Sequence, residues 1–121
     1  MSTKDITAAE FNGIISDNDI VLVDFWASWC GPCRAFAPTF TASSEKHPDV
    51  FHAKVDTEAE QALASAAEIQ AIPTLMAFKK GQLVFRHSGM LAANQLDEVI
   101  SQIKEFDIDA AMAEKGDGTD A

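Results

Sequence analysis

Residues 26–34 read Trp26-Ala27-Ser28-Trp29-Cys30-Gly31-Pro32-Cys33-Arg34 and follow directly on an apolar run, Ile20–Trp26. This run is rich in β-branched and aromatic residues, which is typical of a strand buried on both faces in the middle of a parallel sheet. A helix is predicted from about residue 31 to residue 46, with Pro32 in its first turn and a kink at Pro38. The only two cysteines of the chain therefore lie where a buried strand meets the N-terminus of a helix.

The position of Cys30 favours its thiolate, because unpaired backbone N–H groups and the positive end of the helix dipole face it. The thiolate is the form of cysteine that attacks disulfides. Cys33 lies three residues further on, on the same helix face, and can attack the mixed disulfide that Cys30 forms with a substrate. Gly31 relaxes the local dihedrals and admits a substrate backbone. The pattern predicts a dithiol that exchanges with the disulfides of other molecules.

Two structural interpretations compete with this one. A disulfide that closes so small a loop constrains little of the unfolded chain, so a purely structural staple is disfavoured. The pair could also be half of a zinc site, but structural zinc usually needs four protein ligands. The chain has no second cysteine pair, and its histidines, His47, His52 and His87, lack ligand spacing. We therefore expect redox chemistry and no metal.

Two sequence patterns mark helix starts before and after this region. Thr7 and Glu10 predict a capping box at the start of a short helix. Thr57 and Glu60 predict a second capping box, which opens an Ala-rich helix that ends near residue 68. A closing helix is expected to bury one face, formed by Leu96, Val99, Ile100 and Ile103.

The strand patterns complete an α/β arrangement. Strands are predicted over residues 4–6, 51–56, 74–78 and 83–87 in addition to the first apolar run. The connection Lys79-Lys80-Gly81-Gln82 is short enough to make the last two strands an antiparallel hairpin with a solvated turn. The order of elements predicts an α/β layer fold with one mixed sheet.

The composition fits one globular domain. The 121 residues, 47% of them hydrophobic, are enough for one ordinary core. The net charge of −10 disfavours nucleic-acid binding, which needs a basic surface. No apolar run approaches the roughly 20 residues that span a bilayer. Residues 1–10 lack the basic region and apolar stretch of a secretory signal, so we expect a cytoplasmic protein that does not associate with membranes.

The C-terminal residues differ from the rest of the chain. We predict a domain over residues 1–106 and an acidic tail over residues 107–121, partly disordered, with an extra helical turn around residues 108–112. The only basic residue of this tail is Lys115, which opposes the acidic Asp107, Asp109, Glu114, Asp117 and Asp120.

Residues 26–34 resemble the active-site signature of the thioredoxin family. Other family features follow in the family's order and spacing over about residues 3–106: a buried carboxylate, a helix-kinking proline, a strand that carries a lysine, a cis-proline segment and two glycines near the terminal hairpin. They match Asp24, Pro38, Ala53–Asp56, Ile72–Thr74, Gly81 and Gly89. The resemblance implies the thioredoxin fold, with a central mixed sheet of four to five strands flanked by about four helices on both faces.

The resemblance also implies roles for two charged residues. Asp24 would take the proton from Cys33 as that thiol attacks, and Lys54 would modulate the charge of Asp24. The sequence alone allows other interpretations. A buried aspartate can be purely structural if backbone groups bind it, and a lysine on a strand often faces solvent. Burial would raise the pKa of Asp24, and we favour its functional role because a charge in an apolar strand is rarely accidental.

Substrate docking is implied for a second group of residues. Most X–Pro bonds are trans, but the resemblance implies that the Ile72–Pro73 bond is cis and turns the backbone before it toward the dithiol. A substrate segment could then pair with Ile72 like an added strand. Core packing is the commoner fate of tryptophan, yet the resemblance places Trp29 on a docking surface. The remaining expected docking residues are Gly31, Pro32, Gly89 and Met90.

The function that the resemblance implies is reduction of protein disulfides by a monomer with no bound cofactor. A flavin-containing thioredoxin reductase that uses NADPH would recycle it, and disulfide-containing client proteins would be its substrates. Two alternatives stay open: an oxidase or isomerase of the same fold, and a binding module whose thiols are not used.

Two residues depart from the family pattern. Thr57 replaces a residue that is often apolar, and Ala92 stands where a capping Ser or Thr is expected.

Overall fold

The computed structural model describes residues 3–111 and contains one five-stranded sheet with the strand order β1-β3-β2-β4-β5. The predicted strands and helices are all present, with ends that differ by a few residues. The strands are β1 (Thr3–Asp5), β2 (Ile20–Trp26), β3 (Phe51–Asp56), β4 (Thr74–Lys79) and β5 (Gln82–Ser88). The helices are α1 (Ala8–Asp17), α2 (Gly31–Lys46), α3 (Gln61–Ala66) and α4 (Ala93–Glu105).

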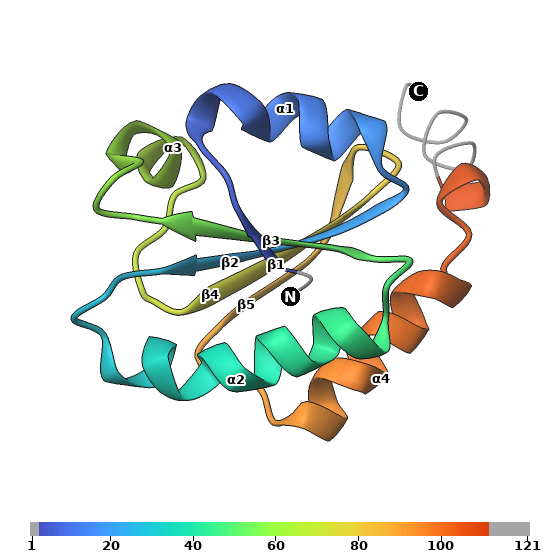
Figure 1. Cartoon of the computed structure of the whole chain (residues 1–121). Coiled ribbons are helices and arrows are strands. Elements are labelled where there is room, and N and C mark those ends of the chain that lie inside the picture. Colours follow the sequence, from blue (N-terminus) through green and yellow to red (C-terminus); the bar gives the residue numbers. More distant parts are fainter. Residues whose placement is uncertain (1–2, 112–121) are drawn as a thin grey trace.

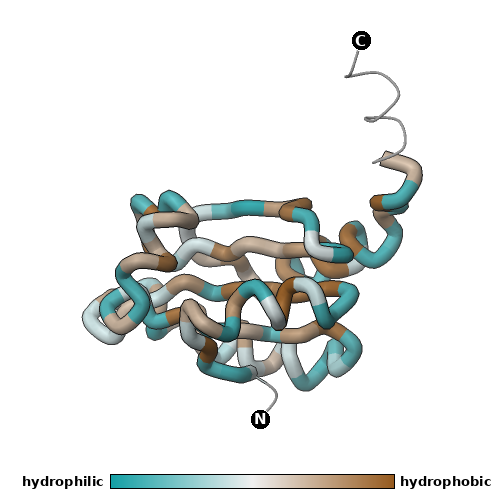
Figure 2. Tube along the Cα trace, turned by 90° about the horizontal axis from the view of Figure 1, so that it is seen from above, coloured by the Kyte–Doolittle hydropathy of each residue, from teal (hydrophilic) through white to brown (hydrophobic). Residues whose placement is uncertain are grey.

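The sheet is mixed, as expected. β1 and β2 each pair with β3 in parallel, whereas β4 is antiparallel to both β2 and β5. β2 therefore lies at the centre of the sheet, which explains its almost unbroken apolar sequence. Figure 2 shows apolar residues concentrated along the strands and polar residues around them.

Helices cover both faces of the sheet, with α1 and α3 on one side and α2 and α4 on the other (Figure 1). Side chains alternate along β2, so Val21 and Val23 pack toward α1 while Leu22 packs toward α2 and α4. The core on the α2 side includes Phe36 and Phe40, both almost fully buried. These two phenylalanines hold α2 against the sheet.

The predicted capping box at Thr57 and Glu60 is wrong, because α3 begins only at Gln61. Both side chains bind elsewhere. The Thr57 hydroxyl donates to the Trp26 carbonyl over 3.0 Å, and the Glu60 carboxylate accepts from the N–H of Ala8 over 2.9 Å. Glu60 therefore satisfies a free amide at the start of α1, a tertiary contact that replaces the local cap.

A solvated turn was predicted at Lys79 and Lys80, and this is wrong for Lys79. Lys79 is 7% exposed, and its ammonium donates to the carbonyls of Ile103, Lys104 and Phe106 over 2.7, 3.0 and 2.7 Å. The C-terminal carbonyls of a helix lack partners within the helix, and a cation there also complements the helix dipole. Lys79 therefore fastens the end of α4 to the sheet.

The chain continues past α4 and stays close to the turn between β4 and β5. Residues 108–111 are helical, Ile108 is buried, and the Lys80 ammonium lies 2.8 Å from the Asp109 carboxylate. The predicted helical turn is therefore present up to residue 111. The remainder of the predicted acidic tail lies outside the described residues, and the domain division stays a prediction. No helix within residues 3–111 is long and apolar enough to cross a membrane.

Replacing Lys79 by Met should lower the free energy of unfolding by about 2–3 kcal/mol, because charged hydrogen bonds to buried carbonyls are lost. Urea unfolding of the oxidised protein measures this loss. Lys80→Met is the matched control, since it removes a neighbouring lysine whose ion pair is exposed to solvent. Equal destabilisation by the two variants would contradict the anchoring role of Lys79.

Candidate active site

Cys30 and Cys33 form a disulfide at the N-terminus of α2, with their Cα atoms 5.2 Å apart. Cys30 is the N-cap residue in an extended conformation, and its sulfur accepts the N–H of Cys33 over 3.2 Å. The sulfur thus occupies the place that a Ser or Asp oxygen takes in an ordinary cap. This geometry would stabilise negative charge on Cys30 in the reduced protein.

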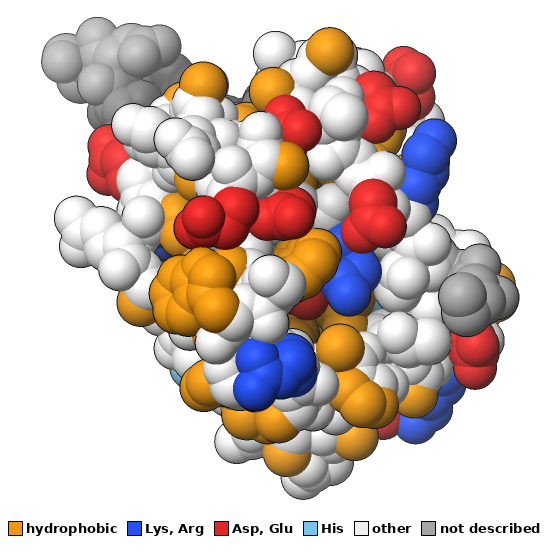
Figure 3. All heavy atoms as spheres, turned by 60° about the vertical axis from the view of Figure 1, so that its left-hand side comes forward, with side chains coloured by type: hydrophobic (Ala, Val, Ile, Leu, Met, Phe, Trp, Pro, Cys, Tyr) orange, Lys and Arg blue, Asp and Glu red, His pale blue; other side chains and the backbone are white. Residues whose placement is uncertain are grey.

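The two cysteines differ in access, although both are buried, with 4% and 3% of their surface exposed. A groove of about 520 Å³ reaches Cys30 and not Cys33. Its other lining residues are Trp29, Gly31, Pro32, Thr57, Ala64, Ile69, Gln70, Ala71 and Ile72. The end of the molecule where α2 begins faces the viewer in Figure 3, where apolar surface is flanked by carboxylates. A molecule in the groove therefore meets Cys30 first.

The Ile72–Pro73 peptide bond is cis, as expected from the resemblance. The carbonyl oxygen of Ile72 lies 3.7 Å from the Cys30 sulfur. Within residues 3–111, no backbone group pairs with the N–H or carbonyl of Ile72. The next carbonyl, that of Pro73, accepts the N–H of Gly89 over 2.7 Å. The segment before Pro73 therefore presents free backbone groups beside the Cys30 sulfur.

Asp24 is almost completely buried, with 1% of its surface exposed, as predicted. It lies at the middle of β2, and by alternation along the strand it faces the same side as Leu22, toward α2. Neither carboxylate oxygen has a hydrogen-bond partner among the described residues, which disfavours the purely structural interpretation. Burial raises the pKa of Asp24 to about 7, and the positive charge of Lys54 opposes this rise.

Lys54 is the β3 neighbour of Asp24 in the sheet register. It is half-buried, and its ammonium lies 5.0 Å from the centre of the Trp26 ring. It also lines a cleft of about 250 Å³ at the end of β1 and β3, together with Trp26, Asp56 and Glu60. Lys54 thus connects the region of the buried carboxylate to the surface.

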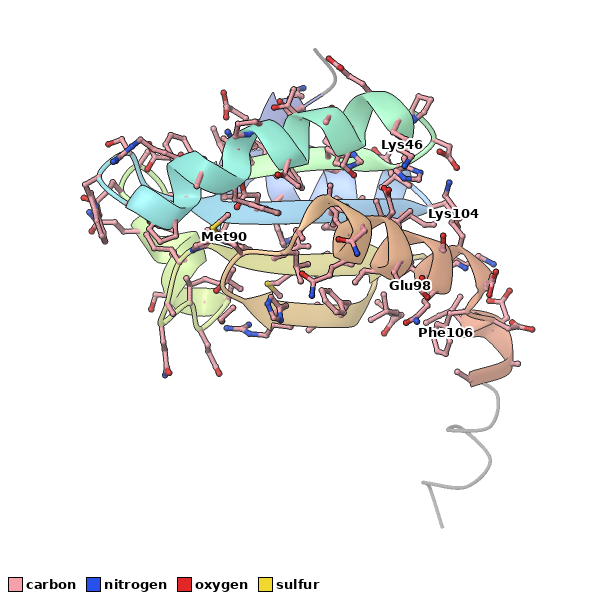
Figure 4. The ribbon with its side chains drawn as sticks, turned by 90° about the horizontal axis from the view of Figure 1, so that it is seen from below. Lys46, Met90, Glu98, Lys104 and Phe106 are labelled. Carbon is pink, nitrogen blue, oxygen red and sulfur yellow. A yellow bond between two sulfur atoms is a disulfide. The ribbon has the colours of Figure 1, made fainter. Side chains whose placement is uncertain are left out.

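The other predicted docking residues lie at the same end of the molecule. Trp29 is 66% exposed, which excludes the core-packing interpretation for this residue. Met90 is 44% exposed and lies near the first turn of α2, at the opposite end from Lys46 and Lys104 (Figure 4). Gly89 adopts a φ of +104°, a conformation that favours glycine. Neither Gly89 nor Met90 lines the groove.

Sequence reasoning missed Glu58, whose carboxylate lies 3.4 Å from the indole Nε1 of Trp29. The predicted cap at Thr57 had placed Glu58 inside a helix. A signal for its true position was present: Asp56, two residues earlier, can accept the N–H of Glu58 in an Asx turn, and it does so over 2.9 Å.

Within residues 3–111, no group of three or more His, Cys, Asp or Glu side chains comes together as a possible metal site. The histidines have separate partners. His52 is buried, and its two ring nitrogens lie 3.0 Å from the Ser43 hydroxyl and 2.9 Å from the Val50 carbonyl. His47 lies 3.1 Å from Asp97.

Comparison with known proteins places these features in a family context. The sequence model of the thioredoxin family matches residues 2–104. The chain is 44% identical over 108 residues to a Streptomyces coelicolor protein provisionally named thioredoxin 2, covering 89% of this chain and 81% of that one. It is 39% identical over 89 residues to thioredoxin-1 of Saccharomyces cerevisiae, covering 74% and 86%. A mutant thioredoxin from Halobacterium salinarum has a similar structure, with a TM-score of 0.82, 34% identity and coverage of 88% and 94%.

The raised pKa of Asp24 predicts a pH-dependent cost to stability. Because the folded pKa of about 7 exceeds the ordinary aspartate pKa of 3.8, the folded state binds more protons than the unfolded state between these two values. Stability should fall as pH rises through this window and level off above it. Asp24→Asn removes the charge, so the variant should be more stable than the wild type at pH 8, by up to about 4 kcal/mol, and similar to it at pH 4.

Urea unfolding of both oxidised proteins across this pH range measures the difference. Subtracting the unfolding free energy of one protein from that of the other at each pH cancels the contribution of His52, whose pKa burial lowers. A constant difference between pH 4 and pH 8 would show that Asp24 does not titrate with a raised pKa.

Proposed function

The chain belongs to the thioredoxin family and is a thiol–disulfide reductase, and from this premise we propose how its residues divide the reaction. Cys30 is the attacking nucleophile and Cys33 the resolving thiol. The observation that carries this assignment is the groove, which reaches Cys30 and leaves Cys33 covered. The position of the Cys30 sulfur at the N-cap supports it, since that place favours a thiolate.

The reaction begins from the reduced dithiol. The Cys30 thiolate attacks one sulfur of a client disulfide, the client S–S bond breaks, and one client thiolate leaves. A mixed disulfide now links Cys30 to the client. Cys33 loses its proton and attacks the Cys30 sulfur, which forms the Cys30–Cys33 disulfide and releases the second client thiol. Two electrons have passed from the dithiol to the client; the proton that Cys33 lost ends on the second client thiol, and the first client thiolate takes its proton from solvent.

Asp24 acts as the base for the second step. A carboxylate whose pKa lies near 7 can accept a proton at neutral pH and later return it. Its oxygens have no other partner among the described residues, so they are available for this role. Lys54 lowers the pKa of Asp24 and so keeps part of the population ionised at neutral pH.

Client docking uses the free backbone of Ile72 and the surface around it. An extended client segment adds to this edge like a strand, which brings its disulfide to Cys30. Pro73 fixes the segment, Trp29, Gly31 and Pro32 form the opposite wall of the groove, and Gly89 and Met90 extend the surface.

The remaining assignments are partners and location. Members of this family act on disulfide-containing proteins and are reduced by thioredoxin reductase. We propose that this chain, as a cytoplasmic monomer without a bound cofactor, receives electrons from an NADPH-dependent flavin reductase of that type. Replacing both cysteines by Ser tests whether the biological role depends on the thiols, because a binding role that does not use them would survive that change.

The reduction potential of the Cys30–Cys33 couple separates a reductant from an oxidant. Reference values for other proteins of this fold are roughly −270 mV for thioredoxin and roughly −120 mV for a periplasmic oxidant. We expect a value near the first. Equilibration with a defined thiol buffer, followed by tryptophan fluorescence, measures it, and a value near the second would make this protein an oxidant.

Replacing Cys33 by Ser should trap the client as a stable mixed disulfide on Cys30, because the resolving thiol is absent. Non-reducing electrophoresis and mass spectrometry with insulin as client detect the adduct. Cys30→Ser is the matched variant and should form almost none, since Cys33 is covered. Equal trapping by both variants would contradict the assignment of Cys30 as the nucleophile.

A further inference from the structure

On the α3 side of the groove, the polar group of Thr57 is a hydrogen-bond acceptor. The lining residues there include the apolar Ala64, Ile69 and Ala71. Thr57 also lines the groove, and its hydroxyl proton is committed to the carbonyl of Trp26 over 3.0 Å. Thr57 can therefore only accept a further hydrogen bond from a molecule in the groove.

Glu58, the next residue, is not itself a lining residue of the groove, but it adds an acceptor beside Trp29, which is one. One of its carboxylate oxygens lies 3.4 Å from Nε1 of Trp29. The other has no hydrogen-bond partner within residues 3–111, and none of the ion pairs found there includes Glu58. The carboxylate is thus held beside an exposed aromatic ring with its charge unpaired.

The backbone around Glu58 is held in place by its neighbours. Its N–H donates to the Asp56 carboxylate over 2.9 Å, and its carbonyl accepts from the Gln61 amide over 3.2 Å. The Asp56 carboxylate also lies 3.4 Å from the N–H of Ala59. Glu58 therefore sits on a defined turn, so its carboxylate is directed to the Trp29 side of the groove.

Arg34, the cation that follows the cysteines in the sequence, forms no ion pair with this carboxylate among the described residues. The Arg34 guanidinium donates to the carbonyl of Ser28 over 2.9 Å, which commits one of its N–H groups to the loop before Cys30. The whole chain carries a net charge of −10. A bound segment with a positive side chain would thus be complementary to the Glu58 side of the groove.

We propose that Glu58 and Trp29 form a specificity site for a Lys or Arg of the client, one or two residues from the reacting cysteine. The cation contacts the Glu58 carboxylate and the face of the Trp29 ring, which adds a cation–π interaction to an ion pair. This inference rests on the proposed function and names the class of client that its groove prefers.

The experiment uses three small peptides, each a symmetric disulfide dimer, that differ only in the residues flanking the cysteine: Lys, Gln or Glu. For each peptide, the value of kcat/KM for reduction by this protein is divided by the rate constant for reduction of the same peptide by dithiothreitol. This normalisation removes the effect of the flanking charges on the reactivity of the disulfide itself. For the wild type we expect about a five-fold preference for the Lys peptide over the Gln peptide, which falls with added salt.

Two variants of Glu58 and one control test whether the preference for the Lys peptide depends on the Glu58 carboxylate. Glu58→Gln keeps an acceptor for Trp29 and should reduce the Lys/Gln ratio to near one, while Glu58→Lys should favour the Glu peptide. Glu98→Gln removes the same charge from the exposed surface of α4, away from the groove (Figure 4), and should leave the ratio unchanged.

An unchanged ratio in Glu58→Gln, or an equal fall in Glu98→Gln, would overturn the proposal, because the preference would then be absent or would reflect net charge alone. Equal normalised rates of the wild type on all three peptides would overturn it while leaving the proposed function intact. Failure of the wild type to reduce any peptide would overturn both.

Discussion

The active end of this molecule depends on one junction, where the central strand β2 passes through a short loop into the N-terminus of α2. β2 is paired on both sides, and α2 is held to the sheet by Phe36 and Phe40. Cys30 caps the helix, so its sulfur is fixed relative to both elements. The loop around cis-Pro73 precedes β4, the other neighbour of β2, and reaches the same end of the sheet. The groove, Cys30 and the free Ile72 backbone lie together there because three adjacent elements converge at this junction.

The same central strand carries a group that is costly to bury. Asp24 is buried without a hydrogen-bond partner among the described residues, and its raised pKa records the penalty of holding a charge there. A hydrophobic residue would pack the core more stably at this position. A protein tolerates such a local conflict where function requires it, and the conflict here lies beneath the helix that carries the dithiol. Stability and the proton transfer proposed for Asp24 thus make opposite demands on one side chain.

The loop between β3 and α3 gives the groove its second wall. Two of its residues, Thr57 and Glu60, fit a local helix cap by sequence, yet each has a distant partner: Thr57 binds the backbone of Trp26 and Glu60 binds the start of α1. Glu58, between them, lies beside Trp29. These contacts delay the helix until Gln61 and hold the loop against the active site. The groove and its acidic edge are therefore products of tertiary contacts.

The sequence by itself determined the layered α/β fold, the central strand, the helix that starts at the cysteines and the hairpin, because these depend on local periodicity and on the chemistry of Gly and Pro. The burial of Asp24 could also be predicted, since its neighbours in the strand are apolar. The cis bond at Pro73 followed only from resemblance to a family, as local preference favours trans. Only the tertiary structure decided which cysteine is accessible, where Glu58 points, and that Lys79 is buried against the end of α4. Each of these depends on partners distant in the sequence, and no local pattern specifies which partner a polar side chain will meet.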